Sequence, residues 1–206
     1  MSQVINAIKQ RRSIRKYQPR PVPPEMIREI LDAAKYAPSA HNAQPWRFIV
    51  LTETMQKHNL TKDMIEAWLQ ALTRDGAPAE TQKSLTKEYY TRFSEAPLLV
   101  VACLSLENMR WYPDEARQKW ERDLAMQSLS AAIQNMLLVI YAKELGACWY
   151  AAPAFCKGAV RQALKIPAEV EPQALITIGY PAETPVASSR KPIETFSFLG
   201  FWDQKL

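Results

Sequence analysis

The sequence predicts an α+β fold in which helices cover the faces of a small sheet. Segments with helical spacing of apolar residues alternate along the 206 residues with short apolar runs of strand length. The connections lack the short, regular lengths of a doubly wound sheet, and neither G-x-G-x-x-G nor G-x-x-x-x-G-K occurs. Residues 126–145 are apolar nearly all round, which indicates a helix buried in a large core or against a second copy of the chain.

The N-terminal half is expected to contain two short helices, a strand and two longer helices. Apolar residues at positions 4, 5 and 8 define one face of the opening helix. Four prolines between 19 and 24 then force an extended connection. Pro24 suits the first turn of the next helix, which Pro38 stops. The remaining elements are a strand at 46–51, an amphipathic helix marked by apolar residues from 60 to 72, and a helix at 78–93.

The C-terminal half is expected to centre on one strand and one long helix. The run at 96–104 is continuously apolar, as in a strand buried on both faces. A helix of about eight turns follows from 113 to 145. A strand or loop at 147–152, a short helix at 155–164 and a final strand at 174–180 precede a proline-containing tail.

Composition favours one globular domain over the whole of 1–206, with about 181–206 as a C-terminal arm. The formal charge of +5 is modest, and 48% of the residues are hydrophobic. Three cysteines without C-x-x-C spacing indicate neither a disulfide framework nor a zinc site. No secretion pattern opens the chain, and polar residues interrupt 124–145, so a soluble, cytoplasmic protein without bound metal is expected.

Two clusters combine arginine with serine, near opposite ends of the chain. Arg11, Arg12, Ser13 and Arg15 follow the opening helix, and Arg190 follows two serines in the tail. Planar guanidinium groups bind phosphate oxygens in pairs, so the two clusters together suggest one phosphate clamp. The alternative is two solvated basic patches, which is what charge runs usually are.

Two further segments suit a ligand rather than a plain surface. Residues 38–46, PSAHNAQPW, carry no formal charge and offer a hydroxyl, amides and an imidazole between two prolines. We call residues 38–42 of this stretch the cradle. Residues 148–153 place small alanines after a tyrosine, so that a flat ligand could approach the backbone, although an ordinary buried strand would show the same pattern. Only two histidines occur and neither adjoins a cysteine, which argues against a thiol hydrolase. The six tryptophans are more typical of core and interface packing than of nucleic-acid binding.

In their order along the chain, several motifs resemble the nitroreductase family of FMN flavoproteins. They are RRSIR, PSAHNAQPWRF, AIQNMLL, LGACWY, ITIGYP and SRKP, and the resemblance covers residue 8 to about 193. Segments such as EAPLLVV and YPDEAR look most like the flavin domain of the reductase that acts in deazaflavin-coenzyme biosynthesis. The resemblance implies a three-layer sandwich with a mixed, mostly antiparallel sheet flanked by helices, in an interlocked homodimer. It also implies one FMN at each subunit interface, helix 126–145 at that interface, and the C-terminal arm against the partner or the rim of the site.

The resemblance assigns site residues by position. Arg11, Arg12 and Ser13 fall where the family grips the phosphate and ribityl chain, and Arg15 falls at the pyrimidine edge of the ring. The remaining assignments are the partner-chain loop (Pro38, Ser39, Ala40, His41, Asn42), the segment whose backbone N–H meets flavin N5 (Tyr150, Ala151, Ala152) and a C-terminal phosphate anchor (Arg190). Ala40 stands where many family members have a second serine, and Ala151 and Ala152 replace the Glu-Gly or Gly-Gly that is common beside N5. At these positions the backbone can still contact the flavin, but side-chain contacts are not expected. His41 is also unusual, and either stabilises the loop or meets the ring or substrate.

The implied activity needs no catalytic side chain, because the cofactor carries the chemistry. We expect hydride transfer from NAD(P)H through FMN to a small electron-poor acceptor such as a nitro, quinone or unsaturated compound. One alternative is a reductase or binding protein for a deazaflavin coenzyme or its enol-type precursor. Another is a protein that binds flavin without catalysis.

Overall fold

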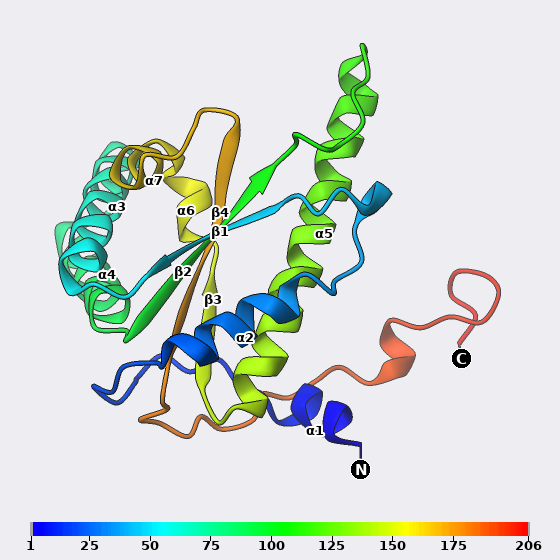
Figure 1. Ribbon diagram of the computed structural model, residues 1–206, viewed down its shortest axis with the longest axis horizontal. Coiled ribbons are helices and arrows are strands. Elements are labelled where there is room, and N and C mark those ends of the chain that lie inside the picture. The colour runs from blue at the N-terminus through cyan, green and yellow to red at the C-terminus, as the bar shows by residue number, and fades with distance from the viewer. Residues whose placement is uncertain (1, 206) are drawn as a thin grey trace.

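A four-stranded sheet forms the middle layer of the computed structural model, which describes residues 2–205 (Figure 1). The strand order is β1-β2-β4-β3, with β1 at Trp46–Leu51, β2 at Leu98–Ser105, β3 at Gly146–Tyr150 and β4 at Val170–Gly179. Every strand pair in this part of the chain is antiparallel, so the expected mostly antiparallel sheet forms, without the parallel strand pair that a mixed sheet would have. The one parallel pairing among the described residues is an isolated bridge between Ser13 and Ala147, because the N-terminal segment meets β3 without forming a strand.

The continuous apolar run of β2 serves two cores, as predicted for a strand buried on both faces. Leu98, Val100, Ala102 and Leu104 face one core together with α2 (Pro24–Ala34) and α5 (Glu115–Ala142). The alternate residues Leu99, Val101 and Cys103 face the other, under α3 (Thr54–Arg74), α4 (Ala79–Ser94) and α7 (Lys157–Leu164). Because successive strand residues point to opposite faces, the sheet lies between two helical layers, and the expected three-layer α+β sandwich is confirmed (Figure 1).

The other predicted elements form with small changes at their ends. β1 has the predicted bounds, β4 begins four residues earlier, and β3 is a strand that ends at Tyr150. The helix expected at 155–164 is α7, which begins two residues later because the backbone leaves helical geometry at Cys156, and a separate one-turn helix, α6 (Ala152–Phe155), precedes it.

The opening helix α1 (Gln3–Gln10) forms, but its apolar face does not enter the core of its own chain. Val4 and Ile8 are 61% and 55% exposed, and Ala7 is the only residue of α1 that is buried. An amphipathic helix normally buries its apolar stripe, so this face lacks a covering surface in the single subunit.

Helix α5 is the long apolar element, shorter at both ends than predicted. The Asp114 side chain caps its start by accepting a hydrogen bond from the Arg117 backbone N–H at 2.9 Å. Among the described residues α5 alone has the length and composition of a membrane span. It is nevertheless a core helix, because residues such as Leu129, Ile133 and Met136 are buried against the sheet and α2.

After β4 the chain leaves the sheet as the C-terminal arm, residues 181–205, which runs past α1 to an outlying end (Figure 1). Phe201 and Trp202 are 80% and 81% exposed there, and Phe198 stacks on Trp202 with ring centroids 4.7 Å apart. The arm therefore buries little within its own subunit. Its predicted packing on a partner stays a prediction, as does the assignment of 1–206 to one domain.

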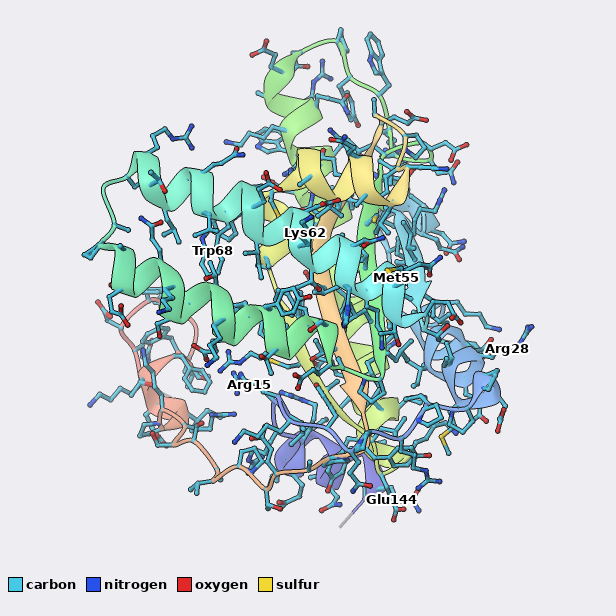
Figure 2. All side chains as sticks on the ribbon, turned by 90° about the vertical axis from the view of Figure 1, so that its left-hand side faces the viewer. Arg15, Arg28, Met55, Lys62, Trp68 and Glu144 are labelled. Atoms are coloured by element: carbon cyan, nitrogen blue, oxygen red, sulfur yellow. The ribbon has the colours of Figure 1, made fainter. Side chains whose placement is uncertain are left out.

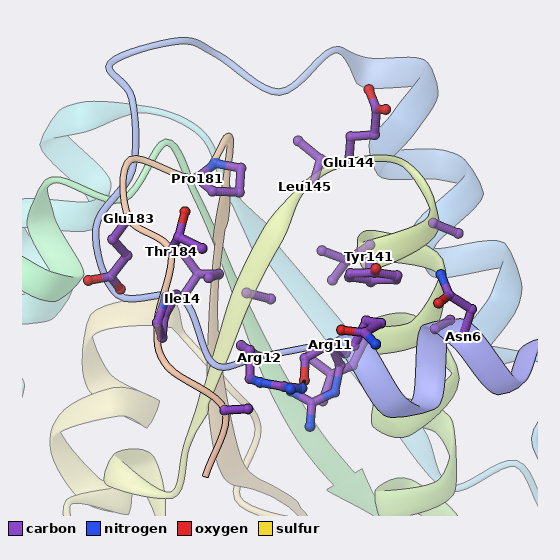
Figure 3. Close-up of a pocket in the computed structure, with 18 of the residues that line it drawn as sticks. Asn6, Arg11, Arg12, Ile14, Tyr141, Glu144, Leu145, Pro181, Glu183 and Thr184 are labelled. Carbon is purple, nitrogen blue, oxygen red and sulfur yellow. Dashed lines mark hydrogen bonds between the residues drawn. The ribbon is translucent and has the colours of Figure 1, made fainter.

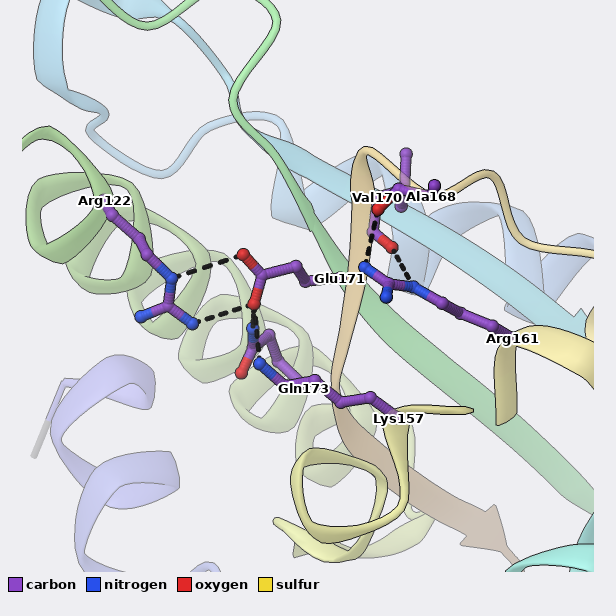
Figure 4. A network of polar contacts seen from close by, with 7 residues as sticks. All are labelled: Arg122, Lys157, Arg161, Ala168, Val170, Glu171 and Gln173. Atoms are coloured by element: carbon purple, nitrogen blue, oxygen red, sulfur yellow. Dashed lines mark hydrogen bonds and ion pairs between the residues drawn. The ribbon is translucent and has the colours of Figure 1, made fainter. Parts of the chain in front are cut away.

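One carboxylate joins the two helical layers to the sheet (Figure 4). Glu171 of β4 accepts hydrogen bonds from Arg122 Nη2 of α5 at 2.9 Å and from Lys157 Nζ of α7 at 2.6 Å. The Gln173 amide adds a third donor at 3.1 Å. Arg122 first and Lys157 second hold the pKa of Glu171 at about 2, below the ordinary 4.5.

We expect Glu171→Gln to lower the free energy of unfolding at pH 7 by about 1–2 kcal/mol, a value reduced for partial solvent exposure. Because the folded-state pKa of Glu171 is depressed, this contribution is present above pH 4.5 and lost as the pH falls toward 2. Urea unfolding at pH 7 and pH 3 should therefore show a smaller acid loss in the variant. Glu169→Gln, at an exposed neighbour, is the control. Equal acid losses in both variants would contradict the assignment.

Candidate functional site

The basic segment Arg11–Arg15 lies along the open edge of β3. Ile14 donates its backbone N–H to the Ala147 carbonyl at 2.9 Å, next to the bridge between Ser13 and Ala147. The contact is close because Gly146 has no side chain: a Cβ built on Gly146 would lie 2.6 Å from Ile14 Cγ1. Gly146 of β3 therefore allows Ile14, within the basic segment, to approach the sheet edge.

The chain that leaves β4 holds this segment from its other side. A carboxylate oxygen of Glu183 accepts the backbone N–H groups of Arg15 at 2.6 Å and of Lys16 at 3.2 Å. Ala182 donates its own N–H to the Lys16 carbonyl at 3.0 Å. Glu183 was not among the predicted site residues, and no local signal could have indicated it, since the residues whose N–H groups it accepts lie 168 and 167 positions away.

A pocket of about 810 Å³ opens beside this segment, between α1, the C-terminal end of α5 and residues 181–187 (Figure 3). Arg11 and Arg12 line it. Arg12 Nη1 donates to the Lys9 and Arg11 carbonyls, both at 2.8 Å, and so covers the end of α1. The Arg11 guanidinium has no hydrogen bond or ion pair with any residue in 2–205. The pocket is large enough to hold a small-molecule ligand. The Arg11 guanidinium at its wall, unpaired among the described residues, is available to bind an anionic group of such a ligand.

The predicted ring-binding residues lie on the α4 side of the same edge. Arg15 lies beside α4 (Figure 2). Its guanidinium makes one weak hydrogen bond, a 3.5 Å contact from Nη1 to the Ser13 carbonyl. Its charge reaches Tyr150, whose pKa burial raises and Arg15 partly lowers. Neither Ala151 nor Ala152 donates its backbone N–H to another described residue. The structure thus brings the basic segment and residues 150–152 together and leaves two backbone donors at the turn.

The Tyr150 ring is fixed from the α4 side, where it packs edge-on against Phe93 with centroids 5.0 Å apart. Its hydroxyl is buried without a hydrogen-bond partner among the described residues, although the nearby Cys148 thiol raises its pKa further. The side chain of Tyr150 therefore packs in the core, and the predicted ligand contact would come from its backbone.

Tyr150→Phe is accordingly expected to raise the free energy of unfolding by up to about 1 kcal/mol, because it removes a buried, unsatisfied hydroxyl. FMN affinity should not change, since the predicted contacts come from the backbone. Chemical denaturation and flavin titration measure the two quantities. A tenfold loss of affinity at unchanged stability would instead show that the hydroxyl contacts the ligand.

The cradle, residues 38–42, forms a short 3-10 turn over Ala40–Asn42 in which His41 and Asn42 have φ of 55° and 54°. Two side chains of α5 hold it. Ser128 Oγ accepts the Ala40 N–H at 3.2 Å, and a Glu121 oxygen lies 3.2 Å from His41 Nε2. Of the two roles predicted for His41, loop stabilisation or contact with the ring or substrate, this contact fits the first.

Within one subunit the cradle is remote from the pocket. Ser128 holds the cradle and Tyr141 lines the pocket, and 13 residues of α5 separate them, or about 20 Å along the helix axis. Figure 1 shows the same separation, with the cradle beside the N-terminal half of α5 and α1 near its C-terminal end. The structure does not bring the predicted loop and the predicted phosphate grip together in a single chain.

Arg190 is also outside the pocket. Its Nη1 donates to the carbonyls of Ser188 and Ser189 at 3.3 and 3.2 Å, and its side chain lies on the exposed arm. Ala187, three positions earlier, does line the pocket. The predicted clamp between Arg11 and Arg190 is therefore not formed in this subunit, and its formation stays a prediction.

Gly146→Ala should displace Ile14 and the arginines beside it, because the new methyl group would overlap the Ile14 side chain. We expect a loss of about 1–3 kcal/mol in unfolding free energy, and weaker binding of anionic ligands. Gly158→Ala in α7 is the matched control, since nothing lies within 4 Å of an added Cβ. That control should gain about 0.5–1 kcal/mol. Thermal unfolding and FMN titration check both, and equal effects of the two changes would contradict the role of Gly146.

The fold and pocket together define an α+β protein with a pocket at a sheet edge that is lined by two arginines and lies between α1, α5 and the arm. The chain belongs to the nitroreductase family, whose family pattern matches residues 8–180.

Relatives match along most of the chain. It is 35% identical over 187 residues to a Methanothermobacter thermautotrophicus protein assigned as NADH dehydrogenase/NAD(P)H nitroreductase, covering 88% of this chain and 79% of that protein. YfhC of Bacillus subtilis, assigned as an NAD(P)H nitroreductase, is 31% identical over 186 residues, covering 90% and 88%. A protein assigned as a nitroreductase from Desulfovibrio desulfuricans, crystallised with FMN, is 28% identical with a TM-score of 0.72, covering 95% of each chain. The finer resemblance to the deazaflavin reductase stays a prediction.

Proposed function

We propose that this protein is an FMN-dependent oxidoreductase that uses NAD(P)H. Membership of the nitroreductase family supports this, as do relatives assigned as NAD(P)H nitroreductases and the related structure crystallised with FMN. The observation that carries the proposal is the Arg11 guanidinium, which has no hydrogen-bond or ion-pair partner in the described chain and lines the pocket beside Ala147 of β3.

The residues present fit a phosphorylated flavin. Arg11, Arg12 and Ser13 would hold the phosphate and ribityl chain, since two guanidinium groups and a hydroxyl match its oxygens. Arg15 would hold negative charge at the pyrimidine edge of the ring. The free N–H groups of Ala151 and Ala152 would orient N5. When bound, FMN supplies hydride acceptance and return, and the protein supplies orientation, charge and exclusion of water.

We also propose that the working unit is a homodimer in which each cradle completes the site of the partner. The cradle is too far from the pocket of its own subunit to contribute there, and it presents neutral polar groups outward. Apolar surface of α1, of the arm and of α5 near Trp120 and Leu124 is exposed in the single chain. Large apolar side chains exposed on three elements are suited to burial in an interface. Cytoplasmic location fits this assignment and belongs to the same proposal.

The proposed acceptor is a small electron-poor or unsaturated molecule. The segment 67–90 of α3 and α4, together with Trp111 and Tyr112, would select among acceptors, because these residues lie outside the flavin-binding elements and include exposed aromatic rings.

The test is to add FMN to purified apoprotein and then NADH or NADPH without oxygen. We expect a bound-flavin band near 450 nm that bleaches on addition of one nicotinamide, and parallel lines in initial-rate plots against a panel of quinones, nitroarenes and deazaflavin. A colourless monomer that takes up no FMN would contradict the proposal. Flavin that binds but does not bleach would indicate a non-catalytic flavin protein, and bleaching by reduced deazaflavin alone would favour the deazaflavin alternative.

A further inference from the structure

We infer that Glu121 and His41 form a positioning pair that holds the cradle in the one conformation that can meet the partner's flavin. The inference rests on the proposed function, in which the cradle completes the site of the other subunit. It assigns a role to Glu121, a buried acid of α5 that does not line the pocket.

The Glu121 carboxylate joins three parts of the chain. Its side chain is 5% exposed, and its two oxygens each lie 3.2 Å from a nitrogen: one from His41 Nε2 of the cradle, the other from the backbone N of Arg110, which donates its N–H. Ser128 lies seven residues later, on the same face of α5, and accepts the N–H of Ala40. The cradle is therefore tied to one helix face at two points about 10 Å apart along the axis.

The backbone of the cradle needs such support. His41 and Asn42 both have left-handed φ, which costs side chains other than glycine about 1 kcal/mol or more each. Pro38, His41 and Asn42 are exposed, so no neighbouring side chains in 2–205 cover them and hold the loop in this conformation. Without the pair, the loop would sample other conformations.

The pair is not the best solution for stability alone. Burying a carboxylate is costly, and an apolar side chain at the same place on α5 would normally pack as well or better. The carboxylate makes the loop position specific, because its two oxygens accept hydrogen bonds only when His41 and the Arg110 backbone N–H are in their observed positions. A loop held in its binding conformation loses less entropy when it meets a ligand. The geometry thus favours preorganisation of the cradle for the flavin of the partner.

The experiment compares His41→Ala, His41→Gln and Glu121→Gln with Asp123→Asn, which makes the same carboxylate-to-amide change at an exposed position of α5. We expect His41→Ala and Glu121→Gln to raise the FMN dissociation constant about tenfold, the effect of losing one hydrogen bond to a charged group. His41→Gln, whose amide nitrogen can take the place of Nε2, should restore most of the affinity. The visible circular dichroism of bound FMN should change in His41→Ala and not in Asp123→Asn.

The outcomes separate this inference from the proposed function. If wild-type protein takes up no FMN, the proposed function fails and the inference with it. If wild-type binds FMN and His41→Ala binds it equally tightly, only the inference fails. It also fails if affinity falls strictly in step with the melting temperature of the apoprotein and His41→Gln restores neither, because the pair would then be purely structural.

Discussion

Exchanging Arg11 and Arg12 for glutamate is expected to weaken FMN binding by at least about 100-fold. Both side chains line the pocket, and the change replaces two phosphate-binding cations with two anions that repel the same group. Fluorescence quenching of FMN on titration with apoprotein measures the loss. Arg28→Glu with Lys87→Glu is the control, since it makes the same change in net charge at exposed positions of α2 and α4 (Figure 2 labels Arg28).

A second variant separates ligand binding from folding. Arg12 also covers the last carbonyls of α1, so its replacement affects the helix end. Arg11 has no such duty among the described residues, and Arg11→Gln should lower affinity about tenfold with little change in melting temperature. If Arg11→Gln and the control variant bind FMN alike, the phosphate does not lie in this pocket.

Hybrid dimers are expected to recover flavin binding that neither parent has. One parent would carry Arg11→Glu and Arg12→Glu, and the other Ser39→Glu and Asn42→Glu in the cradle. In a hybrid, one site combines the intact arginines of one subunit with the intact cradle of the other, and the second site carries both defects. Purified hybrids should therefore bind one FMN per dimer, about half of the wild-type occupancy.

The reason for this expectation is the separation of about 20 Å along α5 between the cradle contact at Ser128 and the pocket residue Tyr141. Co-expression of differently tagged subunits and flavin quantification give the result. A hybrid without flavin would place the whole site in one subunit. A cradle parent that retains full flavin would remove the cradle from the site altogether.

Much of the architecture could be predicted from local patterns. β1 has its predicted bounds, and β2 serves both cores as its unbroken apolar run indicates. The errors arose where local signals were weak. The short helix α6 before the predicted helix at 155–164 was not expected. The wholly antiparallel pairing depends on which strands meet, which no single segment encodes.

Of the candidate site, the residue types could be predicted and their arrangement could not. The sequence named Arg11, Arg15 and residues 150–152. In the structure, the segment that carries the two arginines follows the edge of β3, with Arg11 at the pocket and Arg15 near Tyr150. The sequence did not indicate Glu183 or Glu121, which look like ordinary charged surface residues in their own segments. Their importance comes from partners 168 and 80 positions away.

The sequence by itself determined the helices and strands, the buried strand β2 and the chemical character of the basic segment and the cradle, because these depend on spacing and side-chain type within short windows. Only the tertiary structure decided that Gly146 admits the basic segment to the edge of β3, that Glu121 holds His41, and that α5 keeps the cradle away from the pocket of its own subunit. Those features depend on how distant segments pack on one sheet, and packing is a property of the whole chain.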